Sequence, residues 1–428
     1  MDKNTPTSKQ NEPIEIAVIG LGYVGLPLAV AMAEHHSVIG YDINSQRVQQ
    51  LKEHNDLTQE VTTVQLQQAT QLSFTDDKKT IEAANHYIIT VPTPVDENNT
   101  PDLSPLVSAS ELVGSLLNEG DTVIYESTVY PGATEGVCAK ILAAESNLIL
   151  NQGFYLGYSP ERINPGDKVN TLTSIVKVVS GSNEATARRV NALYEKIISA
   201  GTHLAPSIKV AEAAKAIENT QRDINIAFMN ELSMMLHEMD IDVLEVIEAA
   251  ATKWNFLKFT PGLVGGHCIG VDPYYLIHKS QEKGYFPQLI TTARRINENM
   301  STYVSERILK LMALHRKHIV SAKVLIMGLT FKENCPDLRN TRVVEIVEQL
   351  QRYHVQIEVY DPWVGPQDAA AINQPLVKEP AKEFYDLVVL AVAHDQFLKT
   401  SPREYLVPDG VLFDLKGLLP EEWVDERL

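Results

Sequence analysis

The chain has 428 residues, a formal net charge of −18 and 44% hydrophobic residues. This length predicts two or three domains, because a single core rarely grows beyond about 250–300 residues. The acidic balance argues against a nucleic-acid-binding protein, whose surface is usually basic. The 3 cysteines are too few for a disulfide framework and lack zinc-ligand spacing, so we expect no metal site and a reducing, cytoplasmic setting.

Residues 1–13 are polar and predict a disordered tail without a signal peptide. From residue 14, short β-branched runs alternate with helical stretches, which predicts an α/β domain with a doubly wound parallel sheet over residues 14–205. The strand candidates in this domain are 14–19, 37–41, 86–91, 121–125 and 154–159.

One apolar run, Ile16 to Ala33, is long enough to suggest a membrane span. Three glycines and Pro27 interrupt it, so a buried strand followed by a buried helix explains the pattern better. We therefore expect no membrane association.

The second half of the chain changes character twice. Residues 206–305 predict a central helical domain, because 210–239 contains no Pro or Gly and 241–251 and 287–316 also have helical patterns. We expect the long helix to form a homodimer. Residues 306–428 predict a second, smaller Rossmann-like domain with strand candidates at 323–329, 355–362, 386–392 and 410–415. Its first turn lacks two of the three glycines of the opening turn, so we expect no second dinucleotide site.

The first strand runs into the sequence GLGYVG, and the next strand ends in Asp42. In this context the glycines permit a tight turn, approach of a pyrophosphate and close helix packing. A carboxylate at Asp42 accepts from ribose hydroxyls and repels a 2′-phosphate, which favours NAD over NADP; a turn kept for packing alone is the alternative. Arg47 either pairs with the adenosine end or is merely solvated. The expected contacts of the turn come from Gly20, Gly22, Tyr23, Val24 and Gly25.

The densest chemical signal is PGLVGGHCIGVDP, residues 261–273. Glycines flank Cys268, and Asp272 followed by Pro273 predicts a helix start, whose dipole would favour a thiolate. Two alternatives stay open: Cys268 is a small buried residue, and Asp272 only caps the helix. We expect His267 to orient the loop rather than act as a base. Of the other cysteines, we expect Cys138 in the core and Cys335 in a polar loop without a visible partner.

Seven motifs occur in an order that resembles the UDP-glucose/GDP-mannose dehydrogenase family over about residues 14 to 420. The motifs are GLGYVGLPLA (20–29), VPTPV (91–95), ESTVYPG (126–132), YSPERINPG (158–166), AEAAKAIENT (211–220), GGHCIGVDPYYL (265–276) and GLTFKENCPDLRNT (328–341). The resemblance is greatest to the branch that oxidises UDP-N-acetylglucosamine or UDP-N-acetylgalactosamine for capsule or O-antigen polysaccharide.

This resemblance implies a four-electron oxidation of the C6 alcohol to a carboxylate with two NAD per substrate. Cys268 would form a thiohemiacetal and then a thioester, which water hydrolyses. Lys215 and Asn219 would stabilise oxyanions and position water, with Asp272 as partner base or water-orienting carboxylate. Thr128 and Glu161 would serve hydrolysis, with Glu161 as the base.

The resemblance also implies ligand contacts. Thr93 and Thr128 would contact the cofactor. Phe256 and Phe259 would either stack on uracil or simply pack. The other implied substrate contacts are Glu161, Arg162, Lys215, Asn219, Gly265, Lys332 and Arg339.

Two departures from UDP-glucose dehydrogenases favour an N-acetylated substrate. Val271 stands where those enzymes commonly have a Lys, and they have a second Glu near the position that Pro165 holds here. The C4 configuration stays open, and UDP-N-acetylmannosamine and UDP-glucose remain alternatives. A two-electron sugar or hydroxyacid dehydrogenase and a non-enzymatic nucleotide-sugar sensor are further alternatives. Counting NADH per substrate separates them.

Overall fold

The computed structural model describes residues 13–428 except 164–168, 366–369, 371–372, 374–375 and 400. The predicted disordered tail, apart from Pro13, and Pro165 therefore lie outside the described residues. The chain folds into two compact units. Unit 1 comprises Met1–Glu218 and Tyr274–Gly284, and unit 2 comprises Asn219–Pro273 and Tyr285–Leu428.

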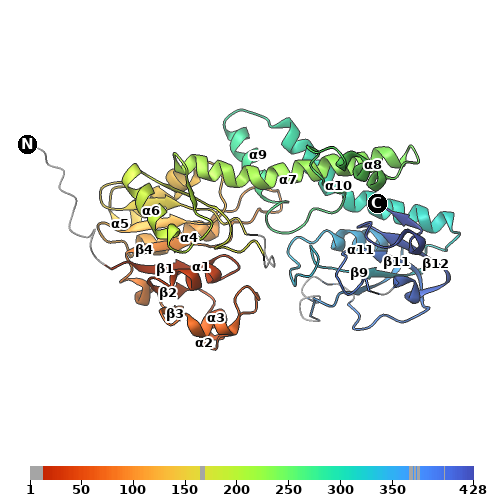
Figure 1. Cartoon of the computed structure of the whole chain (residues 1–428), viewed down its shortest axis with the longest axis horizontal. Helices are drawn as coiled ribbons and strands as arrows, with labels where there is room; N and C mark the ends of the chain where they lie inside the picture. Colours follow the sequence, from red (N-terminus) through yellow and green to blue (C-terminus); the bar gives the residue numbers. More distant parts are fainter. Residues whose placement is uncertain (1–12, 164–168, 366–369, 371–372, 374–375, 400) are drawn as a thin grey trace, which may run out of the picture. The chain divides into compact units, whose positions relative to one another are not determined.

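Unit 1 contains an eight-stranded sheet in the order β3-β2-β1-β4-β5-β6-β7-β8, part of which is labelled in Figure 1. Neighbouring strands are parallel except β6 and β7, which are antiparallel. The order β3-β2-β1-β4-β5-β6 is that of a dinucleotide-binding sheet, whose ligand crevice opens where the order reverses, between β1 and β4. The bounds are β1 Glu15–Ile19, β2 Ser37–Tyr41, β3 Leu72–Thr75, β4 His86–Ile89, β5 Thr122–Tyr125, β6 Tyr155–Tyr158, β7 Lys177–Gly181 and β8 Thr202–Leu204.

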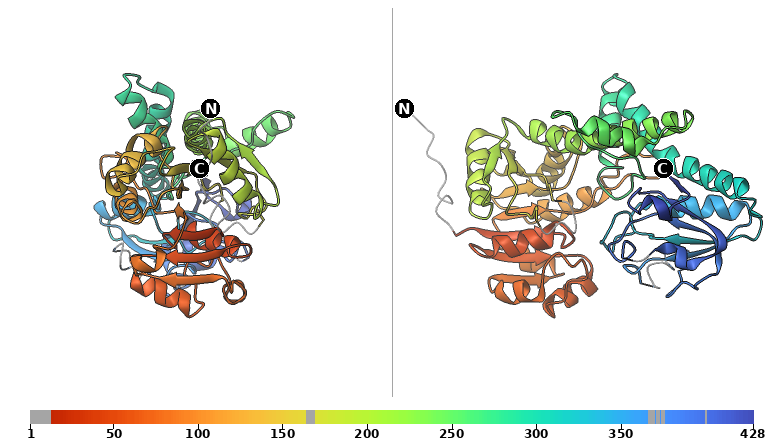
Figure 2. Two further views of the ribbon diagram at one scale, coloured as in Figure 1. Left: turned by 90° about the vertical axis from the view of Figure 1, so that its left-hand side faces the viewer. Right: turned by 45° about the vertical axis from the view of Figure 1, so that its right-hand side comes forward.

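Helices cover this sheet, and its central strands are buried because both faces are packed. Ile16, Ile88 and Ile124, from three neighbouring strands, belong to one core cluster. Both views of Figure 2 show the red and orange strands β1 and β2 side by side, with helices next to them. The helical segments of this unit are α1 Gly25–Met32, α2 Ser45–Lys52, α3 Thr63–Gln68, η2 Lys78–Ile81, α4 Ser104–Gly114, η3 Thr134–Cys138, α5 Ala139–Ser146 and α6 Glu184–Glu195.

The predicted helical middle of the chain is confirmed. Helix α7, Ile208–His237, has 30 residues, and the division between the two units falls inside it. It is followed by α8 Val243–Ala251, α9 Asp272–Glu282 and α10 Gln288–Leu314. The side chain of Asp242 caps α8 by accepting from the backbone N–H groups of the first turn, which explains why the helix begins there.

The second predicted α/β region forms a five-stranded parallel sheet in the order β10-β9-β11-β12-β13. Val304 and Ile308 of α10 and Ile346 of α11 share a core cluster with strand residues Val324 and Val389, so these two helices cover one face. The bounds are β9 Lys323–Met327, α11 Val343–Arg352, β10 Gln356–Tyr360, β11 Tyr385–Leu390, η4 Pro402–Tyr405, β12 Leu406–Asp414, η5 Glu421–Trp423 and β13 Glu426–Arg427.

The apolar run from Ile16 to Ala33 is divided between β1 and α1, as predicted. Among the described residues, no helix has the length and apolar character needed to cross a membrane.

Candidate active site

The glycine turn lies at the switch point of the first sheet, directly after β1. Gly20 has φ +97°, and the hydroxyl of Thr90, at the end of β4, donates to its carbonyl oxygen at 2.7 Å. Helix α1 starts at Gly25, so the first-turn N–H groups point toward the turn. A Cβ on Gly22 would meet nothing within 4 Å, whereas one on Gly25 would lie 1.8 Å from the Gly20 oxygen. The turn therefore leaves an open backbone face at Gly22 and a closely packed one at Gly25, which fits the pyrophosphate of NAD.

Asp42 follows β2 and faces the same turn. One carboxylate oxygen accepts from the backbone N–H of Leu21 at 2.8 Å, and the other accepts from Asn44 at 2.9 Å. Arg47 is not simply solvated: it donates to the Leu21 carbonyl at 3.0 Å and forms an ion pair with Asp56 at 2.8 Å. Arg47 therefore ties the turn to Asp56, and Tyr23 and Val24, near the end of the turn, are half-buried.

The second sheet has a similar glycine turn after β9, but neighbouring side chains occupy the space around it. Gly328 after β9 has φ +94°, and a Cβ there would lie 2.5 Å from the side chain of Val392. Asp361, the counterpart of Asp42, accepts from the N–H groups of Leu329 and Thr330 and contacts the buried His394 at 3.1 Å. Asp42 accepts similar backbone bonds, but Asp361 is only 4% exposed and also contacts an imidazole, so its carboxylate is not open to a ribose.

The ends of β4 and β5 bring Thr93 and Thr128 together. The Thr93 hydroxyl donates to the Thr128 carbonyl at 2.7 Å, and the Tyr275 hydroxyl of α9 donates to the Thr93 carbonyl at 2.7 Å. Because β5 and β6 are parallel, Thr128 and Glu161 follow strands at the same sheet edge.

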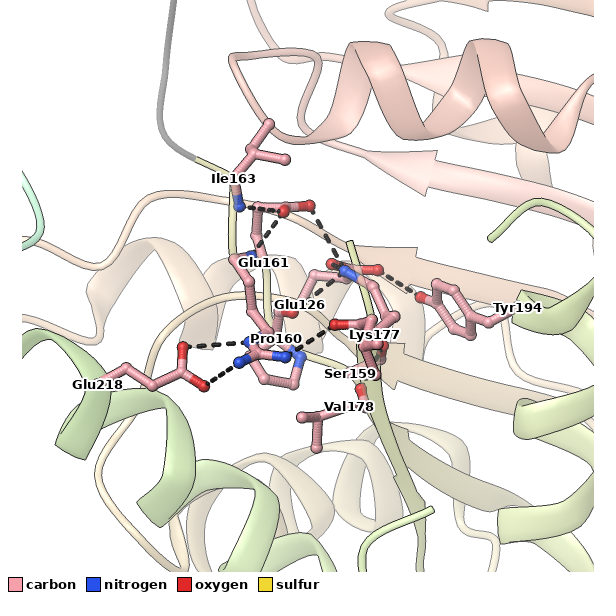
Figure 3. Close-up of polar contacts among 11 residues, drawn as sticks. Glu126, Ser159, Pro160, Glu161, Ile163, Lys177, Val178, Tyr194 and Glu218 are labelled. Atoms are coloured by element: carbon pink, nitrogen blue, oxygen red, sulfur yellow. Dashed lines mark hydrogen bonds and ion pairs between the residues drawn. The ribbon is translucent and has the colours of Figure 1, made fainter. Parts of the chain in front are cut away.

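Glu161 is 7% exposed, and one of its oxygens accepts from the N–H groups of Arg162 and Ile163 at 2.6 and 2.7 Å (Figure 3). Arg162, expected to contact substrate, forms an ion pair with Glu218 at 2.8 Å and donates to a backbone carbonyl.

Two buried charged residues that the sequence analysis did not single out lie beside Glu161. Lys177 begins β7 and forms ion pairs with Glu126 at 2.5 Å and Glu161 at 3.4 Å. Burial raises the pKa of Glu126 to about 7; Lys177 opposes the rise and Glu161 adds to it. The available signal was a single lysine inside the apolar run IVKVVSG.

In unit 2, the glycine-rich loop that carries Cys268 is held by buried polar side chains. Asn230 of α7 accepts from the Gly262 N–H at 2.8 Å and donates to the Gly262 carbonyl at 3.1 Å. It also donates to Asn297 of α10 at 2.8 Å, and Asn297 in turn donates to Asp223 at 2.7 Å. This network fixes the start of the loop.

The chain itself packs against the glycines that precede Cys268. A Cβ on Gly265 would lie 2.7 Å from the Asn340 carbonyl oxygen, and one on Gly266, where φ is +80°, would lie 2.8 Å from the Phe331 ring. Gly265 is expected to contact the substrate, but the close approach of the Asn340 carbonyl already requires a glycine at this position. Cys268 is partly exposed, and its carbonyl oxygen accepts from the Asp272 N–H at 2.8 Å, directly before α9.

Asp272 is the first residue of α9 and is 2% exposed. Asn219 donates to its carboxylate at 2.6 Å, so the predicted Asn and Asp are in contact. Asp272 itself lies four residues after Cys268 in the sequence. Lys215 lies one turn before Asn219 on α7 and is 7% exposed.

The segment that carries Lys332 and Arg339 lies against the cysteine loop. His267 is 3.7 Å from the Asp337 carboxylate and makes an edge contact with Phe331. Arg339 donates to both Asp337 oxygens; burial alone would raise the pKa of Asp337, but these hydrogen bonds hold it below its ordinary value. Lys332 is 5.7 Å from the Phe331 ring. Unit 2 thus brings Cys268, Lys332 and Arg339 to one region.

The remaining candidates lie in apolar surroundings. Phe256 and Phe259 pack against the cluster of Met229, Leu236, Val243 and Ile247. Cys138 is buried, which raises the pKa of its thiol to about 12, and Cys335 is buried rather than in an open polar loop. Among the described residues, no His, Cys, Asp or Glu cluster could hold a metal ion.

A largely parallel sheet in this order, with a glycine turn and an acidic residue at its switch point, defines a dinucleotide-binding domain of the kind that NAD-dependent dehydrogenases contain. The UDP-glucose/GDP-mannose dehydrogenase family matches in all three of its parts: the NAD binding domain at residues 14–198, the central domain at 209–299 and the UDP binding domain at 325–421. The chain belongs to this family.

Three relatives illustrate the similarity. The chain is 53% identical over 419 residues to UDP-N-acetyl-D-glucosamine 6-dehydrogenase of Pseudomonas aeruginosa. The aligned residues cover 97% of this chain and 99% of the relative. It is 51% identical to the Salmonella typhi protein of the same name, with the same two shares covered. The solved structure of UDP-D-ManNAc dehydrogenase from Pyrococcus horikoshii superposes with a TM-score of 0.88 at 30% identity, covering 97% of this chain and 98% of that one.

Proposed function

We propose that the chain oxidises the C6 alcohol of a UDP-N-acetylhexosamine, UDP-GlcNAc or UDP-GalNAc, to the uronic acid for capsule or O-antigen synthesis. The observation that carries the proposal is the position of Cys268. It is partly exposed and lies four residues before Asp272, the first residue of α9 and the hydrogen-bond partner of Asn219. A thiol near a helix N-terminus is favoured as a thiolate, the reactive nucleophile.

The cofactor would be held by the turn from Gly20 to Gly25 and by Asp42. When bound, NAD supplies a hydride acceptor for each of the two oxidations. Between them the Cys268 sulfur would bond to the aldehyde carbon, whose oxygen takes the proton to give a thiohemiacetal; the second oxidation then converts this thiohemiacetal to a thioester. Lys215 and Asn219 donate to the developing oxyanion, and removal of such a donor costs on the order of 3 kcal/mol.

Hydrolysis is assigned to Glu161 and Thr128 at the sheet edge. Glu161 takes a proton from water while the water oxygen attacks the thioester carbon and the Cys268 thiolate leaves. Asp272 orients water or serves as a partner base. Lys332 and Arg339, with Arg162 and Gly265, are assigned to the substrate, and the uridine to the domain that contains β9.

The test is to supply purified protein with NAD and, separately, UDP-GlcNAc, UDP-GalNAc, UDP-ManNAc and UDP-glucose. The proposal expects two NADH per sugar and an N-acetylhexosaminuronate product. One NADH per sugar would identify a two-electron dehydrogenase, and ligand binding without NADH would identify a sensor. Preference for UDP-ManNAc or UDP-glucose would correct the substrate alone.

Three further proposals concern the oligomeric state, the cellular location and the domain bounds. We propose a homodimer through α7, because Ile217, Phe228 and Met235 are 53%, 51% and 44% exposed. Their spacing of 11 and 7 residues places them within about 20° of one another around the helix. Light scattering of wild type and Phe228→Glu tests this, with a monomeric wild type as the contrary result. We propose a cytoplasmic location and the domain bounds 14–205, 206–305 and 306–428.

A further inference from the structure

A cluster of charged and polar side chains is sealed inside unit 1, next to Glu161. Glu126 and Lys177 are each 1% exposed, and Tyr194 of α6 is fully buried. They come from the end of β5, the start of β7 and the last turn of α6 (Figure 3). The mechanism assigned above uses none of them.

Every donor of the Lys177 ammonium has a neighbouring acceptor. The nitrogen donates to Glu126 at 2.5 Å, to the Pro160 carbonyl at 3.1 Å and to Glu161 at 3.4 Å. Tyr194 donates to the other Glu126 oxygen at 2.5 Å. An ammonium with three acceptors has no freedom left to rotate, so Lys177 is fixed in place.

The two oxygens of Glu161 are held from different sides. Backbone N–H groups of Arg162 and Ile163 bind Oε1, whereas Oε2 faces Lys177. Since the first contacts are local to the turn after β6, Lys177 is the link that ties this carboxylate to the interior of the sheet.

Stability alone does not explain a buried ammonium between two carboxylates. Removing charges from water costs free energy that their attraction often fails to repay, and apolar side chains usually serve as well. Burial also raises the pKa of Glu126 to about 7, well above its ordinary value. Such groups gather at functional sites more often than elsewhere.

We propose that Lys177 and Glu126 form a positioning pair that holds the Glu161 carboxylate in place for hydrolysis of the Cys268 thioester. The inference rests on the proposed function. Glu126 and Tyr194 fix the ammonium, and the ammonium fixes Oε2 of Glu161. Neither Lys177 nor Glu126 touches the substrate. In the step they support, a C–O bond forms, the C–S bond breaks, the sulfur keeps the electron pair and the water proton passes to Glu161.

The experiment compares Lys177→Met with Glu161→Gln by rapid mixing and intact-protein mass. Both oxidations precede hydrolysis, so Lys177→Met should retain an early burst of NADH while its steady rate falls by about 10²-fold. A covalent sugar adduct on the protein should then accumulate. Ser180→Ala is the matched control: Ser180 is buried on the same strand and donates to the Tyr158 carbonyl at 2.8 Å. Its turnover should stay within about twofold of wild type.

The double variant Lys177→Met/Glu126→Gln separates folding from positioning. The double variant removes the ammonium together with the charge of the fully buried Glu126, and Glu161 keeps its two backbone N–H donors, so thermal stability should partly recover relative to Lys177→Met. Its hydrolysis should stay slow, and it supplies the readout if the single variant does not fold. Recovery of wild-type turnover in the double variant would overturn the inference, as would wild-type hydrolysis by Lys177→Met. If Glu161→Gln itself accumulates no adduct, the proposed function fails instead.

Discussion

The second and third glycines of the cofactor turn, Gly22 and Gly25, should differ in how an alanine substitution changes stability and NAD affinity. In Gly25→Ala the new Cβ would lie 1.8 Å from the Gly20 carbonyl oxygen and 2.4 Å from the Thr90 hydroxyl. The backbone would have to move by about 1 Å, and such overpacking costs about 3 kcal/mol or more against a backbone atom. In Gly22→Ala the Cβ meets nothing within 4 Å, so stability should change by less than about 0.5 kcal/mol.

Affinity for NAD should separate the variants further. If the pyrophosphate approaches the backbone at Gly22, Gly22→Ala should weaken NAD binding by about tenfold or more, equivalent to about 1.4 kcal/mol. Thermal unfolding and calorimetric NAD titration of both variants measure the two effects. Wild-type affinity in Gly22→Ala would refute the cofactor assignment of the turn. Wild-type stability in Gly25→Ala would refute the packing argument.

Three further predictions concern other sites. Asp42→Ala should weaken NAD binding by about tenfold and lower the ratio of NAD affinity to NADP affinity, both measured by calorimetric titration. An unchanged ratio would count against a contact between Asp42 and the ribose. Burial lowers the pKa of His86 from 6.5 to about 4. Between pH 6.5 and about pH 4, this histidine is therefore protonated in the unfolded chain but neutral in the folded chain. Stability should therefore fall as pH falls through this window, and His86→Gln should flatten the fall in unfolding curves; an identical slope would exclude this cause. Asn230→Ala removes the clamp on Gly262 and should cost about 1–3 kcal/mol, while NAD affinity stays at the wild-type value.

The main architecture followed from periodicity, because the central strands and long helices have uniform patterns. Helix α7 contains no Pro or Gly, and the apolar runs of β1 and β9 end in glycine. Four strands escaped prediction for physical reasons. β7 begins with Lys177, whose charge interrupts the apolar pattern. The other three, β3, β8 and β13, have 4, 3 and 2 residues, too few for a period to show.

The candidate site was predictable where chemistry follows local sequence. The glycine turn, Asp42 and the loop around Cys268 lie in short motifs, and the i, i+4 spacing puts Lys215 and Asn219 on one face of a helix. Partners distant in the chain were not predictable. The contact of Asn340 with Gly265 joins residues 75 apart, and the Glu126–Lys177 pair joins residues 51 apart. Only the fold brings such pairs together.

The proposed mechanism depends on one thiol that holds the substrate carbon covalently between two oxidations. The most direct test is Cys268→Ser, measured by uronate formed under saturating NAD and UDP-N-acetylhexosamine, with titrations showing that both ligands still bind. The account predicts retained binding with a loss of turnover of about 10³-fold or more. Uronate formed by this variant at the wild-type rate, with two NADH per sugar, would contradict it.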